Sequence, residues 1–106
     1  MGPRPWRPAA ELEAALERGD LRFAMTLADE VRIERGKPID LATALLFLPL
    51  VAQATPREFD AYALRWLARW AAEKPATIEQ AAEVAASLAD LPTEPVTALD
   101  VLKRAC

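Results

Sequence analysis

The chain has 106 residues, a formal net charge of −3, 53% hydrophobic and 27% charged residues, and only three glycines. This composition is typical of a helical globular domain rather than a disordered or fibrous chain. With no histidine and one cysteine, Cys106, the sequence excludes a histidine-activated nucleophile, a Cys/His zinc set and an internal disulfide. Its 13 basic residues are dispersed among 16 acids, which argues against a nucleic-acid partner.

The first eight residues contain three prolines, and each proline fixes its own φ and steers the preceding residue away from helix. We therefore predict that residues 1–8 form an extended tail and residues 9–106 a single helical domain. The longest uncharged run, residues 41–56, is interrupted by Pro49 and is shorter than the ~20 residues needed to cross a bilayer. No membrane contact is predicted.

Apolar residues recur at helical spacing in six segments, and no segment alternates long enough to indicate a strand. The predicted helices cover about 9–18, 21–35, 41–54, 56–73, 78–90 and 94–105. Short connections place successive helices side by side and antiparallel. The predicted fold class is all-α, with five to six helices in a single compact bundle or a short stack of antiparallel helical hairpins.

Residues with capping properties stand at the predicted helix ends. Gly19 and Gly36 suit left-handed C-terminal caps, and Asp20 and Asp40 suit N-caps. The segments 55–58 and 77–80 both match the capping-box pattern, in which the first and fourth residues bond each other's backbone.

The segment 41–54 has no polar face, and three of its apolar residues, Leu46, Phe47 and Leu50, are candidates for an interaction surface. One interpretation makes this helix the central element of the bundle. The other leaves one side of it for a partner or a second copy of the chain. Pro49 removes a backbone hydrogen bond, which predicts a kink after about Leu45.

The segment 56–73 places Phe59, Tyr62, Trp66 and Trp70 on one helical stripe. Core packing is the first interpretation, and an aromatic wall for an apolar ligand or partner helix is the second. Arg65 and Arg69 project from a different face and are candidates for gripping an anion, although Arg69 can also pair with Glu73.

The segment 78–90 is an amphipathic helix with an alanine-rich face. The residues predicted to face inward are Ile78, Ala81, Ala82, Ala85, Leu88 and Ala89. Small side chains let a neighbouring helix approach closely. The outer stripe of Glu79, Glu83 and Asp90 is interpreted as a solvated face, or else as a docking surface for a basic partner.

Two stretches carry resemblances to known families. Residues 12–38, with Gly19-Asp20 before Ala24 and Pro38 after the helix, resemble one hairpin of a tetratricopeptide repeat, which implies a helical hairpin of the kind that binds peptides. The repeat is not sustained, because Gln53 and Ala54 stand where the Gly-Asp turn would recur. Residues 62–92 are similar to small all-helical proteins common in actinobacterial genomes, a resemblance that implies a cytoplasmic setting.

The leading functional hypothesis is a non-catalytic, cytoplasmic protein-interaction module without metal or cofactor. Its partner is an unknown protein or a second copy of the chain, and its surface comes from the segments 41–54 and 56–73. The alternative is a binder of a small apolar ligand held between the 41–54 helix and the Trp66/Trp70 stripe. A carboxylate-dependent hydrolase is a remote alternative, since paired carboxylates are the one familiar catalytic set that needs no histidine.

Overall fold

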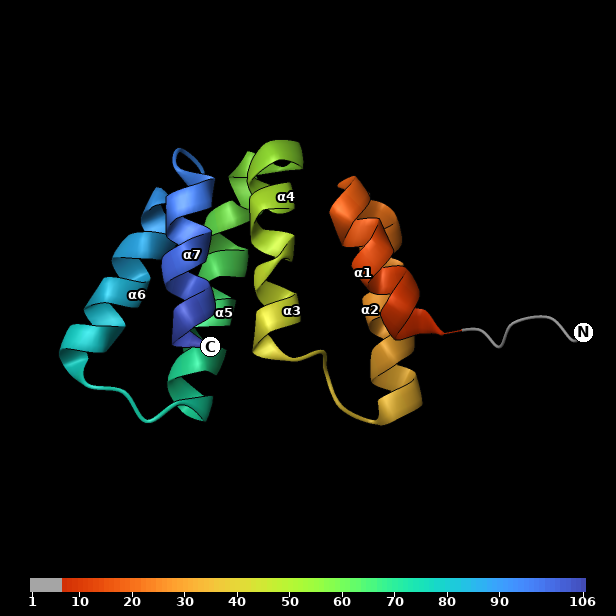
Figure 1. Cartoon of the computed structure of the whole chain (residues 1–106), viewed down its shortest axis with the longest axis horizontal. Helices are drawn as coiled ribbons and strands as arrows, with labels where there is room; N and C mark the ends of the chain where they lie inside the picture. Colours follow the sequence, from red (N-terminus) through yellow and green to blue (C-terminus); the bar gives the residue numbers. More distant parts are fainter. Residues whose placement is uncertain (1–6) are drawn as a thin grey trace, which may run out of the picture. The chain divides into compact units, whose positions relative to one another are not determined.

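The computed structural model describes residues 7–106, and its helices fall into two units, one ending at Ile39 and one running from Asp40 to Cys106 (Figure 1). The α-helices are α1 (Pro8–Arg18), α2 (Leu21–Arg35), α3 (Leu41–Leu45), α4 (Phe47–Ala54), α5 (Phe59–Glu73), α6 (Ile78–Asp90) and α7 (Pro95–Ala105). A short 3-10 helix, η1 (Pro56–Glu58), precedes α5. No strand occurs within residues 7–106, so the all-α prediction is confirmed.

The first unit is a helical hairpin of α1 and α2. Gly19 ends α1 with φ = +74°, a conformation that glycine reaches without a Cβ clash. Asp20 then caps α2 by accepting a hydrogen bond from the Phe23 N–H at 3.2 Å. Helices α1 and α2 pack against each other as a helical hairpin. Residues 1–6 of the predicted tail lie outside the described residues. The tail was predicted to extend to residue 8, but α1 begins at Pro8, because proline suits the first turn of a helix.

The second unit begins with a helix broken in two. Asp40 caps α3 through the Thr43 N–H at 2.8 Å, and α3 and α4 meet at Leu46. Proline at position 49 has no N–H to bond the Leu45 carbonyl four residues earlier, which accounts for a break at the place predicted. If α3 and α4 are counted as one broken helix, residues 7–106 contain six α-helices, as the apolar periodicity predicts.

Helix α5 is the centre of the second unit, because α3 and α4 pack on it and α6 also contacts it. Helix α7 contacts both α6 and α3 and completes the bundle. The core side chains contributed by α5 are Phe59, Ala63, Trp66 and Trp70. The predicted aromatic stripe is therefore the surface on which this unit is built.

One of the two predicted capping boxes forms. Thr77 accepts from the Gln80 N–H at 3.1 Å, and the Gln80 side chain accepts from the Thr77 N–H at 2.9 Å. At Thr55 the prediction is wrong: the hydroxyl lies 3.4 Å from the carbonyl of Val51 and bonds to it, and no side-chain cap is made to η1. Thr55 is both the C-terminal cap residue of α4 and the residue before η1, because no other residue separates the two helices. Its hydroxyl bonds to α4 and is therefore not available to cap η1.

None of the described helices is long and apolar enough to cross a membrane.

Candidate functional site

The two tryptophans of α5 are integrated into the core of the second unit. Trp66 is 4% exposed and its Nε1 donates to the Leu41 carbonyl at 3.0 Å. Trp70 is 3% exposed and its Nε1 donates to the Ala105 carbonyl at 3.1 Å. One turn apart on α5, these indoles tie it to the start of α3 and the end of α7. Because both N–H groups have acceptors, the core interpretation of the stripe is favoured.

The candidate residues of the 41–54 segment differ in accessibility. Phe47 is buried at 7% exposure, whereas Leu46 and Leu50 are half-buried. A partner would therefore reach only the edges of Leu46 and Leu50 on α4. These two residues remain candidates for a contact, and Phe47 offers little surface for one.

Tyr62 is half-buried at the edge of the aromatic stripe, and Arg65 and Arg69 lie on the adjoining side of α5. The Arg65 guanidinium carbon is 4.6 Å from the centre of the Tyr62 ring, in cation–π range. The Arg69 Nε donates to the Glu73 carboxylate at 2.6 Å, as the i,i+4 spacing predicts. The positive charge of Arg69 is thus partly neutralised within the helix.

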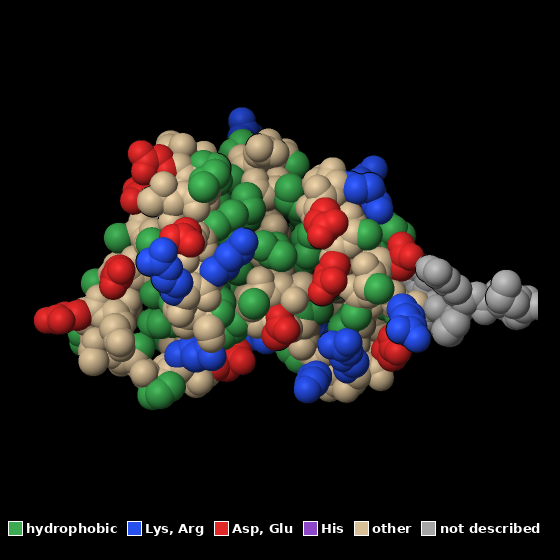
Figure 2. Space-filling model, viewed as in Figure 1, with side chains coloured by type: hydrophobic (Ala, Val, Ile, Leu, Met, Phe, Trp, Pro, Cys, Tyr) green, Lys and Arg blue, Asp and Glu red, His purple; other side chains and the backbone are tan. Residues whose placement is uncertain are grey.

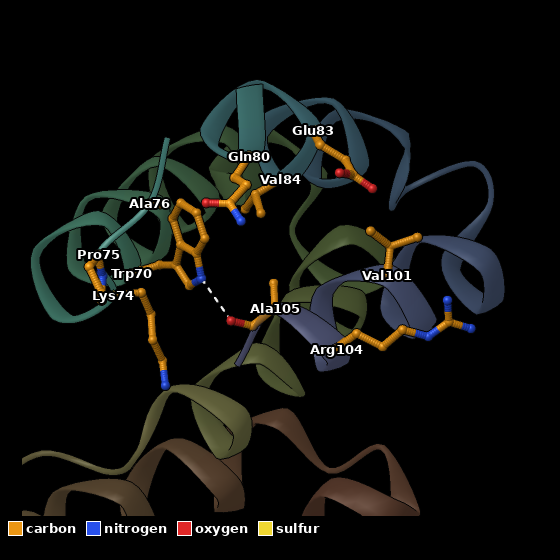
Figure 3. Close-up of a pocket in the computed structure, with 10 residues that line it drawn as sticks. All are labelled: Trp70, Lys74, Pro75, Ala76, Gln80, Glu83, Val84, Val101, Arg104 and Ala105. Atoms are coloured by element: carbon orange, nitrogen blue, oxygen red, sulfur yellow. Dashed lines mark hydrogen bonds between the residues drawn. The ribbon is translucent and has the colours of Figure 1, made fainter. Parts of the chain in front are cut away.

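A hollow of about 400 Å³ lies between the end of α5, the loop after it, α6 and α7. Figure 3 shows that the charged groups of Lys74, Glu83 and Arg104 stand apart around this hollow instead of converging on one point. Arg104 also bonds Asp100 on its own helix. Among the described residues, no buried side-chain nitrogen or oxygen lacks a hydrogen-bond partner. The walls of the hollow therefore offer no buried polar side-chain atom left unpaired for a ligand.

The thiol of Cys106 lies near the same end of the bundle. Burial raises its pKa above the ordinary value, the positive charge of Lys74 opposes that shift, and Asp40 adds to it. The thiol is accordingly protonated at neutral pH and is a weak nucleophile. Within residues 7–106, no three acidic or cysteine side chains lie close enough together to hold a metal ion.

A second cleft, between α5 and α6, is apolar. It has a volume of about 260 Å³, larger than the roughly 150 Å³ cavity that can hold a benzene molecule. Its lining consists of Phe59, Asp60, Ala63, Leu64 and Leu67 from α5 and Ala85, Leu88 and Ala89 from α6. We call this cleft the α5–α6 groove. Among the described residues that line it, Asp60 is the single charged one, and Leu64 on its wall is 64% exposed.

Helix α6 buries a different face from the one that the sequence predicts. The buried residues of α6 are Val84 and Leu88, whereas Ile78 is 87% exposed and Ala82 and Ala89 are also exposed. At about 100° per residue, this turns the buried face by roughly a quarter of the helix circumference. The prediction that Ile78, Ala82 and Ala89 face inward is wrong. Of the alanines in this face, Ala85 and Ala89 line the groove.

Leu64 and Asp60 line this groove, and neither was predicted from the sequence to belong to a site. Leu64 lies two positions before Trp66, roughly 200° around the helix, and so on the opposite side of α5. The sequence feature that could have indicated Leu64 is its position away from the aromatic stripe. A single exposed leucine is ordinary, and it gains meaning only beside the exposed alanines of α6.

The surfaces of α6 and α7 carry charge of both signs. Figure 2 shows acidic side chains along α6 and mixed charges along α7. In the sequence, α6 carries Glu79, Glu83 and Asp90, and α7 carries Asp100, Lys103 and Arg104.

Comparisons with protein-family models, with curated proteins and with solved structures found no match.

Proposed function

We propose that this chain is a non-catalytic protein-interaction module whose docking surface is the α5–α6 groove. The observation that carries the proposal is an apolar cleft with the exposed Leu64 on its α5 wall and the exposed Ala89 on its α6 wall. Burying apolar surface contributes about 25 cal/mol per Å², so covering this groove would be favourable. The low charge of its lining is the composition found at the centre of protein interfaces.

The chemistry of the groove favours an apolar helix as its occupant. Alanines at positions 85 and 89 leave room for the backbone of a third helix to approach closely. Leucine at position 64 can then contact the apolar stripe of that helix. The half-buried Leu46 and Leu50 of α4 are proposed as secondary contacts, in keeping with the surface predicted from the sequence.

A cytoplasmic location and the absence of a nucleic-acid partner belong to the same proposal. The single cysteine suits a reducing compartment, and the net charge of −3 disfavours binding to phosphates.

Site-specific photo-crosslinking tests the groove as a docking surface. A photoreactive amino acid replaces Leu64 in the full chain, in cells of the native host, and crosslinked products are identified by mass spectrometry. The matched control places the same amino acid at Val96, which is 83% exposed on α7 and is not among the residues lining the groove. We expect a discrete protein adduct from position 64 and none from position 96. Equal, diffuse labelling from both positions would contradict the proposal.

A further inference from the structure

We draw no further inference here: the strongest candidate, the apolar α5–α6 groove with the exposed Leu64 on its wall, belongs to the site already described, and nothing in the structure shows what covers it.

Discussion

The two sides of α5 show how one helix divides its residues between core and surface. On one side Trp66 and Trp70 are almost fully buried, and each indole N–H has a carbonyl acceptor. Further around the helix Leu64 stands 64% exposed, beside a cleft that reaches the edge of the buried stripe at Phe59 and Ala63. Both sides are apolar, so hydrophobicity alone does not separate them. They differ in whether another element of the same unit covers them, and mutations should therefore affect stability on one side and association on the other.

The largest expected effect is on the buried side. Trp66→Ala should lower the free energy of unfolding by about 3–5 kcal/mol, since it removes a buried indole and leaves the Leu41 carbonyl without its donor. Chemical denaturation monitored by circular dichroism measures this. Near-wild-type stability would show that Trp66 is not part of the core. It would favour the second interpretation, in which Trp66 belongs to a binding surface.

A smaller effect should separate the two faces of α6. Val84→Ala removes methyl groups from a residue that is 4% exposed and should cost about 2 kcal/mol. The larger residue Ile78, 87% exposed, should cost less than about 0.5 kcal/mol when changed to alanine. Urea unfolding of both variants at one protein concentration compares them. The reverse order would mean that α6 is oriented as the sequence pattern predicts and that the groove is closed.

The hydrogen bond from Trp70 to α7 should contribute about 1 kcal/mol, which Trp70→Phe would remove while keeping most of the aromatic packing. Thermal unfolding detects the loss as a lowered midpoint. Hydrogen exchange should also quicken at the C-terminal end of α7, where Ala105 accepts the bond. An unchanged rate there would contradict a role for Trp70 in tying α5 to α7.

The smallest effect on folding should come from the groove. Leu64→Ala removes side-chain atoms that are mostly exposed, and alanine favours helix, so the change in unfolding free energy should stay within about 0.5 kcal/mol. The measurement is made on dilute protein, in which association contributes least. A loss as large as that of Trp66→Ala would place Leu64 inside the fold and would leave no groove for a partner.

Local rules in the sequence were sufficient to predict most of the fold. Caps at Asp20, Asp40 and Thr77 and left-handed glycines at 19 and 36 set helix ends that agree with the structure. These features depend on residues a few positions apart, and Pro49 acts at equally short range on the break at Leu46. Thr55 departs from the rule because two helices compete for one hydroxyl.

The candidate site could not be predicted in the same way. Alanine is tolerated both in a protein core and at the surface, so the alanine stripe of α6 does not indicate which face of the helix is buried. Val84 and Leu88, the largest residues near one edge of the stripe, pack into the bundle and turn the remaining alanines outward. That outcome depends on how α5, α6 and α7 fit together, which is a property of tertiary packing and not of the helical period.

A matched urea titration of Trp66→Ala and Leu64→Ala, on dilute protein, tests the central claim most directly. Trp66→Ala should lower the free energy of unfolding by about 3–5 kcal/mol, whereas Leu64→Ala should change it by no more than about 0.5 kcal/mol. Losses of similar size from the two variants would contradict the assignment of one side of α5 to the core and the other to the surface.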